Sequence, residues 1–96
     1  MSGPAVAALT LEIHVTYSQS LKDKRQVVKS LKDRLRQKFN IAVAEIDGLE
    51  SWQRSVVAAV TVSNDRAHVA QVLQAVESDA AAVLGSMLVS AEVEWL

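Results

Sequence analysis

The spacing of apolar residues switches repeatedly between the period of a strand and that of a helix, and this switching constrains the fold more than any other feature. From Leu9 to Val15 apolar and polar residues alternate, which predicts a half-buried strand over about residues 6–17. Helical spacing then follows in Leu21, Val28, Leu31, Leu35 and Phe39. Because Ser20 is a suitable N-cap and Asp23 adds a first-turn carboxylate, we expect a helix from Ser20 to about Phe39.

The second half of the chain repeats this alternation of periods. A short apolar run at residues 41–46 predicts a second strand, and the valine-rich residues 55–63 predict a third. Asn64 is the expected cap of a second helix, which closes at Gly85. Alternation over residues 87–95 then predicts a fourth strand whose odd-numbered side chains face the core.

This order of elements predicts an α+β fold, the ferredoxin-like βαββαβ sandwich, in which a four-stranded antiparallel sheet carries two helices on one face. A chain of 96 residues has material for one core, so we expect residues 1–96 to form a single domain. The expected core includes Leu11, Ile13, Leu31, Leu35, Val60, Leu73, Val76 and Val93.

The opposite face of the sheet is expected to be open. If the alternation holds, this face is polar and acidic along the first and last strands, with Glu12, His14, Glu92 and Glu94. On the third strand we expect a neutral patch of Val57, Ala59 and Thr61, through which two copies of the chain could associate.

Composition excludes several kinds of chemistry. The chain has no cysteine, so disulfides, thiolate nucleophiles and cysteine-ligated metal centres are excluded. The apolar start lacks a basic leader and is interrupted by Glu12 and His14, so we expect neither an export signal nor a membrane segment. The expectation is a cytoplasmic protein without a membrane partner.

Charge is distributed very unevenly along the chain. The formal net charge is −1, yet residues 20–39 hold eight of the ten basic residues and only two acidic ones. On a helical wheel, five of these cations fall within an arc of about 80°. They are Lys22, Arg25, Lys29, Lys32 and Arg36, here called the basic ridge. A ridge of this kind can contact successive phosphates of structured RNA, and the alternative is a solvated helix face.

Features that read bases in related sheet proteins are missing. No Gly-x-x-Gly loop and no aromatic RNA-recognition signature occur, so any contact with RNA is expected to depend on shape and charge. Trp52 is expected to close one end of the core. The alternative is that Trp52 and Arg54 form a contact surface for a base or a protein partner.

No motif indicates catalysis or a bound metal. His14 and His68 lie in different predicted elements, and neither has a nearby carboxylate at the spacing of metal ligands. No nucleophile triad or phosphate-binding glycine loop is present. We therefore expect no enzymatic activity, no cofactor and no metal site.

Five segments, in this order along the chain, resemble the YlxP-like bacterial family of unknown function. They are SLKDKRQVVKSLKDRL at 20–35, FN at 39–40, VAEID at 43–47, WQR at 52–54 and SND at 63–65. The resemblance implies a ferredoxin-like fold and a genetic neighbourhood of translation initiation and ribosome maturation factors. It implies no catalytic residues.

Two functions of different classes are therefore expected. The first is a non-enzymatic accessory protein that binds structured RNA or the ribosome through the basic ridge. The second is a protein-interaction module or weak homodimer that uses the open sheet face. A small-molecule or metal-binding regulatory domain is a third, less supported hypothesis.

Overall fold

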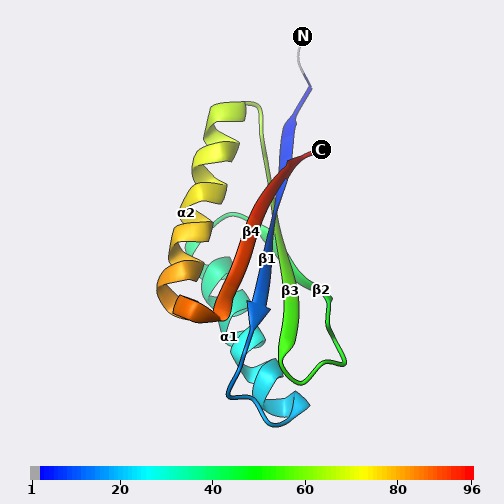
Figure 1. The fold of residues 1–96 in the computed structure, drawn as a ribbon. Coiled ribbons are helices and arrows are strands. Elements are labelled where there is room, and N and C mark those ends of the chain that lie inside the picture. The colour runs from blue at the N-terminus through cyan, green and yellow to red at the C-terminus, as the bar shows by residue number, and fades with distance from the viewer. Residues whose placement is uncertain (1–2) are drawn as a thin grey trace.

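The computed structural model describes residues 3–96 and has the predicted order of elements (Figure 1). The elements are β1 (Ala5–His14), α1 (Leu21–Lys38), β2 (Ala42–Asp47), β3 (Arg54–Ser63), α2 (Arg66–Leu84) and β4 (Leu88–Trp95). A short 3-10 turn, Gly85–Met87, joins α2 to β4. The predicted ferredoxin-like βαββαβ fold is thus confirmed.

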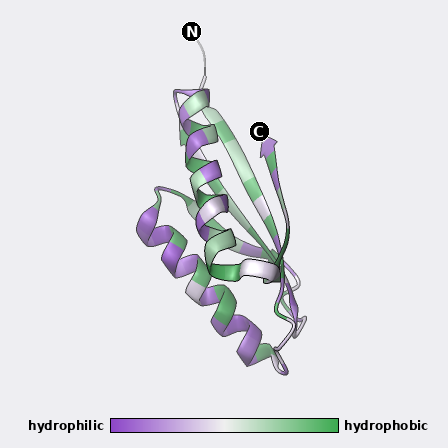
Figure 2. Ribbon diagram, turned by 60° about the vertical axis from the view of Figure 1, so that its left-hand side comes forward, coloured by the Kyte–Doolittle hydropathy of each residue, from purple (hydrophilic) through white to green (hydrophobic). Residues whose placement is uncertain are grey.

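The four strands form one antiparallel sheet in the order β2-β3-β1-β4. Both helices pack on the same face of this sheet, and the other face is open (Figure 1). The central strands β1 and β3 are therefore covered by helices on one side, whereas β2 and β4 are edge strands. Hydrophilic residues dominate the outer side of α1, while the strands are largely hydrophobic (Figure 2).

The two long helices begin with side-chain caps. Ser20 accepts a hydrogen bond of 3.0 Å from the backbone N–H of Asp23, as expected. The expected cap at Asn64 is wrong by one residue, because Asp65 caps α2 and accepts from the N–H of Ala67 at 3.0 Å. Both residue types cap well, and only the backbone geometry decides between adjacent candidates.

The core lies between the sheet and the two helices. Six of the eight residues predicted for it are buried: Leu11, Ile13, Leu31, Leu35, Leu73 and Val76. Val60 is half-buried and lies on the open face, because it pairs with Ala8 and Ala42. Val93 pairs with the buried Leu9 but is 47% exposed. Since β4 is an edge strand, its helix-facing side is only partly covered.

An irregularity in β4 overturns part of the predicted alternation. Glu12 pairs with Ser90 while the next residue, Ile13, pairs with Leu88, so one residue of β4 is left over. This bulge turns Leu88 toward the core and leaves Val89 exposed, where alternation predicts Val89 to face inward.

The open face differs from the expected one at β3. Val57, Ala59 and Thr61 are buried on the helix-covered side, so the predicted neutral patch is wrong. A shift of one position in a strand moves every side chain to the other face. The apolar residues at one end of the open face are instead Val6, Ala8, Ala42, Ala44, Ala58, Val60 and Val62. The four residues predicted for this face are also there: Glu12, His14 and Glu92 lie toward its other end, whereas Glu94 pairs with Ala8 and lies beside the apolar end.

Candidate nucleic-acid interface

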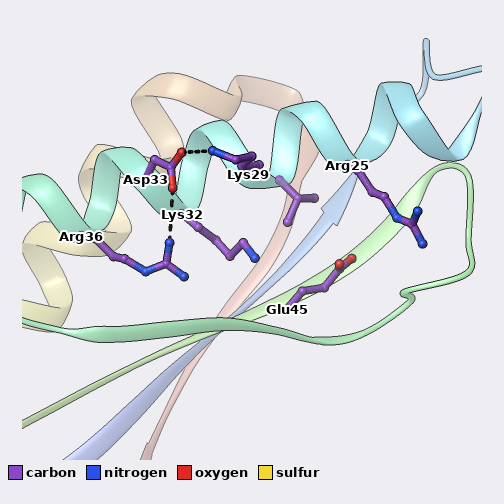
Figure 3. A pocket seen from close by; sticks show the side chains of 7 residues that line it. Arg25, Lys29, Lys32, Asp33, Arg36 and Glu45 are labelled. Atoms are coloured by element: carbon purple, nitrogen blue, oxygen red, sulfur yellow. Dashed lines mark hydrogen bonds and ion pairs between the residues drawn. The ribbon is translucent and has the colours of Figure 1, made fainter.

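Four of the five basic-ridge side chains surround one hollow between α1 and β2. The hollow has a volume of about 410 Å³ and is open to solvent on one side. Its charged lining consists of Arg25, Lys29, Lys32, Asp33, Arg36 and Glu45. Figure 3 shows Arg25, Lys32 and Arg36 extending from α1, with Glu45 reaching toward them from β2. Four cations and two carboxylates leave this surface net positive.

Asp33 neutralises part of the basic ridge. Its carboxylate accepts from Lys29 Nζ at 2.6 Å and from Arg36 Nη1 at 3.3 Å. The hydrogen bond from Lys29 is the main cause that holds the pKa of Asp33 below its ordinary value. Arg36 is tied further by a hydrogen bond of 3.2 Å from Nη2 to the Val43 carbonyl. Lys29 and Arg36 therefore share one negative charge.

Three ridge cations remain without a carboxylate. Among residues 3–96, Lys22, Arg25 and Lys32 have no acidic oxygen within 4.0 Å. Arg25 and Lys32 lie one helical turn on either side of the Lys29 position and both line the hollow. Among residues 3–96, these two are the cations of the hollow that have no carboxylate partner.

Two other cations of α1, Arg34 and Lys38, serve a different purpose on the side that faces α2. Asp79 of α2 accepts from Arg34 Nε at 2.8 Å and from Lys38 Nζ at 2.6 Å. These two hydrogen bonds lower the pKa of Asp79 from 3.8 to about 2. Arg34 and Lys38 thus join the two helices, although the sequence places them within the same basic segment as the ridge.

Lys24 has a role that sequence reasoning missed. Its side chain is 0% exposed, and its Nζ donates to Glu45 Oε2 and to the Gly48 carbonyl, both at 2.7 Å. The signal was present, because Lys24 occupies the same helical stripe as the buried Val28 and Leu31. A cation in an apolar stripe indicates a buried partner.

Glu45 is the acceptor that makes this burial possible. It also accepts a hydrogen bond of 2.7 Å from the Ser55 hydroxyl. Burial raises the pKa of Glu45, but the hydrogen bonds from Lys24 and Ser55 outweigh this effect, so the pKa lies below its ordinary value of 4.5. Glu45 is thus charged at neutral pH; it pairs with Lys24 and also lines the hollow.

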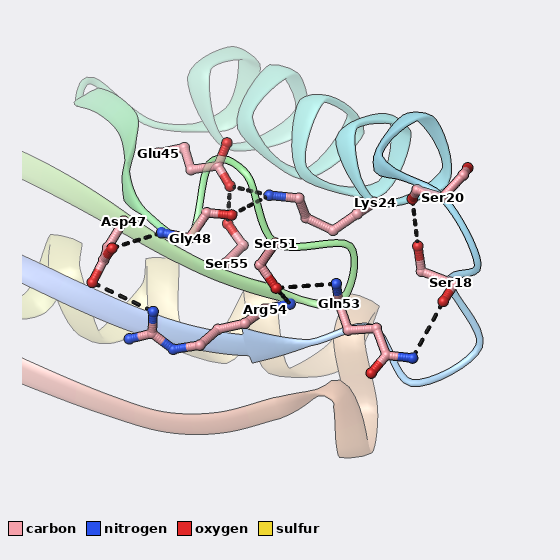
Figure 4. A network of polar contacts seen from close by, with 10 residues as sticks. All are labelled: Ser18, Ser20, Lys24, Glu45, Asp47, Gly48, Ser51, Gln53, Arg54 and Ser55. Carbon is pink, nitrogen blue, oxygen red and sulfur yellow. Dashed lines mark hydrogen bonds and ion pairs between the residues drawn. The ribbon is translucent and has the colours of Figure 1, made fainter.

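The loop between β2 and β3, residues 48–53, is fastened to the start of α1 and to the loop that joins β1 to α1 (Figure 4). Its first residue, Gly48, binds Lys24 through its carbonyl. Its last residue, Gln53, donates from Nε2 to the carbonyls of Thr16 and Ser18, each at 3.3 Å. Gly48 has a φ of +75°, and a Cβ there would lie 2.6 Å from the Arg54 carbonyl oxygen, so this position requires glycine.

Trp52 projects from this fastened loop and is 58% exposed. The expectation that it closes one end of the core is therefore wrong. Arg54, the other residue of the predicted contact surface, forms ion pairs with Glu12 at 3.1 Å and Asp47 at 3.4 Å. By contrast Trp95 packs against the core, and the Arg66 guanidinium lies 3.8 Å from its ring centroid.

Metal-binding clusters and membrane-spanning helices are both absent from the residues that the structure describes. Within residues 3–96, no group of three or more histidine, aspartate and glutamate side chains is placed to hold a metal ion. Over the same range, no helix has both the length and the apolar character needed to cross a membrane.

Comparison with known sequences decides the family. The profile of a family described as "Protein of unknown function (DUF503)" matches residues 6–93. The chain belongs to this DUF503 family. It is also 39% identical over 57 residues to the "Uncharacterized protein YlxP" of Bacillus subtilis (strain 168). The aligned stretch covers 59% of this chain and 62% of YlxP, which is less than two thirds of that relative's length. The resemblance to YlxP-like proteins is therefore confirmed.

Solved structures share the fold of this DUF503 member at low sequence identity. A dimeric ferredoxin-like protein of unknown function from Thermobifida fusca YX aligns with a TM-score of 0.57 and 16% identity, over 100% of this chain and 92% of that one. A C-terminal segment of the alpha subunit of aIF2 from Pyrococcus abyssi aligns with a TM-score of 0.54 and 14% identity, over 100% and 51%. These likenesses support the ferredoxin-like fold.

Proposed function

We propose that this chain is a non-enzymatic accessory protein that binds structured RNA through the basic ridge of α1 and acts in ribosome maturation or translation. The ribosomal part of the proposal rests on the family resemblance and its genetic neighbourhood. The RNA part rests on charge and geometry. In keeping with both, one solved structure with this fold is a segment of the alpha subunit of aIF2.

The observation that carries the RNA proposal is the pair Arg25 and Lys32. Both line the hollow beside β2, and within residues 3–96 neither has a carboxylate partner within 4.0 Å. By contrast, Arg34 and Lys38 on the other side of α1 are both paired with Asp79. From Arg25 to Arg36 the ridge rises about 16 Å along the helix axis, long enough to reach more than one phosphate.

The open sheet face is a poor candidate for base reading. It carries Glu92 and Glu94, whose carboxylates repel phosphate, and its strands present aliphatic side chains rather than the aromatic residues that stack bases in RNA-recognition motifs. The proposed contact is therefore made by the helix layer, and it depends on backbone charge more than on sequence.

The test compares two variants that change net charge equally. Arg25→Gln/Lys32→Gln removes two ridge cations, whereas Gln71→Glu/Gln74→Glu adds two anions on the exposed side of α2. Affinity for a hairpin of ribosomal RNA is measured by filter binding over a series of salt concentrations. If each ridge cation meets one phosphate, the first variant flattens the slope of log affinity against log salt by roughly 1.4 to 1.8.

Equal losses in the two variants would show that net charge alone governs binding, and would reject the ridge as a site. Absence of any binding by the unchanged protein at physiological salt would reject the RNA proposal itself. Thermal unfolding of both variants is the check on folding, and we expect a change of less than about 1 kcal/mol for surface charges of this kind.

A second candidate function, homodimerisation through the open sheet face, is favoured by a separate observation. One end of this face is apolar, and Val62 within it is 60% exposed. A solved neighbour of the same fold, covered over 92% of its length, is dimeric. Exposed aliphatic surface next to polar residues is typical of association sites.

The dimer proposal is tested by light scattering coupled to size-exclusion chromatography. Val62→Glu is expected to shift a dimer to a monomer, because two like charges would then be buried together. Val83→Glu on α2 is the matched control, since Val83 is also exposed but lies on the helix layer. If Val62→Glu has the same molar mass as the parent protein, or if the parent protein is a monomer at high concentration, this candidate is rejected.

A further inference from the structure

Trp52 is an exposed aromatic ring on a loop whose backbone is held in place. The carbonyl of Gly48 and the side chain of Gln53 fasten the two ends of the loop to α1 and to the β1–α1 connection. Ser51 Oγ adds two more contacts inside it, accepting from the N–H groups of Gln53 at 3.3 Å and Arg54 at 2.9 Å. A large ring presented from such a loop loses little conformational entropy when it binds.

The loop lies next to the N-terminal end of the basic ridge. Lys24, which binds the Gly48 carbonyl, immediately precedes Arg25 on α1. In Figure 3 the Arg25 side chain extends toward the β2–β3 loop, while Lys32 and Arg36 lie further along the same hollow. A polyanion that follows the ridge toward its start would therefore leave α1 beside the loop that bears Trp52.

We propose that Trp52 stacks on an unpaired nucleobase of an RNA whose backbone contacts Arg25 and Lys32. The inference rests on the proposed function and specifies its ligand: a stem with an adjoining single-stranded segment rather than a fully paired duplex. In A-form RNA the base faces are occupied by stacking within the helix, and only unpaired bases can stack on an aromatic side chain. Combining an aromatic ring with a line of cations is the general mode of single-strand binding.

An apolar protein partner is the competing occupant of this loop, because Leu49 is also half exposed. Arg25 favours the nucleic acid, because its side chain extends toward this loop in Figure 3 and an apolar protein contact gains nothing from a cation. The two alternatives differ in which side chain matters: stacking requires the ring of Trp52, whereas a general apolar contact uses Leu49 as well.

The experiment uses the full chain carrying Trp95→Phe, so that fluorescence reports on Trp52 alone. The probes are a blunt RNA hairpin and the same hairpin with a short single-stranded oligoadenylate tail. We expect the tailed hairpin, and not the blunt one, to quench Trp52 fluorescence. Trp52→Ala should weaken binding of the tailed hairpin between about 5-fold and 150-fold while leaving the blunt hairpin and the salt slope unchanged.

Trp52→Phe and Leu49→Ala are the companion variants. Phe keeps a π-face and should retain much of the tail-dependent affinity, and Leu49→Ala should retain nearly all of it. Equal affinity for the two hairpins, together with no effect of Trp52→Ala, would overturn the stacking inference. If Arg25→Gln/Lys32→Gln still weakened the binding of both hairpins in that case, the RNA proposal would stand. Equal losses in Leu49→Ala and Trp52→Ala would also overturn it, in favour of a general apolar contact.

Discussion

Lys24 and Glu45 form an ion pair of 2.7 Å across the junction of α1 and β2, and the Glu45 side chain is only 13% exposed. The pair joins a helix to an edge strand beside the hollow that Glu45 lines, and its burial makes each charge depend on the other. Within residues 3–96, every buried side-chain nitrogen and oxygen has a hydrogen-bond partner, and for this pair the Gly48 carbonyl and the Ser55 hydroxyl supply the additional contacts.

Replacing Lys24 with methionine is expected to lower the free energy of unfolding by about 3 to 5 kcal/mol, because Glu45 is left charged without its partner. The double variant Lys24→Met/Glu45→Gln should regain much of this loss, since no buried charge remains. Urea unfolding of the three proteins measures both effects. A single variant as stable as the parent would show that water reaches Glu45 freely and that the pair contributes little.

The ion pairs of Asp79 predict a dependence of stability on pH. Because the pKa of Asp79 falls from 3.8 to about 2 on folding, the unfolded chain binds more protons between these values. Its contribution is therefore complete above about pH 4 and is lost as the pH falls toward 2. Arg34 and Lys38 are half exposed, so solvent screening reduces this contribution to about 1 kcal/mol.

Asp79→Asn is the variant that isolates this effect. Unfolding measured from pH 2 to pH 6 should show a smaller rise in stability with pH than in the parent protein. The lowered pKa of Glu45 acts in the same direction and persists in the variant, so the dependence is reduced rather than abolished. Identical pH profiles in the two proteins would contradict the assignment of Asp79.

Core and edge positions should respond differently to truncation. Leu35 is 0% exposed, so Leu35→Ala is expected to cost about 2 to 5 kcal/mol through lost burial and the cavity left behind. Val93→Ala on the edge strand removes a side chain that is already 47% exposed and should cost less than about 1 kcal/mol. Chemical denaturation compares the two, and a larger loss in Val93→Ala would indicate that β4 is covered in solution by another surface.

Much of the local structure was predictable because it depends on residues close together in the chain. The cap at Ser20, the stripe of Val28, Leu31 and Leu35, and the alternation through β1 all follow from helical or strand periodicity. Which side chains of β3 face the helices was harder to predict. Valine and alanine occur on both faces of this strand, so its sequence has too little apolar–polar alternation to indicate the buried face. For this reason the predictions that Val57 lies on the open face and that Val60 lies in the core were wrong.

The sequence predicted which cations form the candidate site, but not which of them are paired with carboxylates. Helical geometry alone placed Lys29, Lys32 and Arg36 on one side of α1, as the lining of the hollow has them. The exposure of Trp52 was not predictable, because it depends on how a loop of residues 48–53 is fastened to elements elsewhere in the chain.

The sequence by itself determined the order of elements, the fold and the concentration of cations on α1, since each follows from local periodicity or simple counting. Tertiary structure alone decided which cations remain free. Lys24 meets Glu45 across 21 positions and Arg34 meets Asp79 across 45, so their pairing depends on helix placement and strand register. Coulomb attraction falls off with distance and solvent screening, so a carboxylate neutralises only the cation that the fold brings beside it.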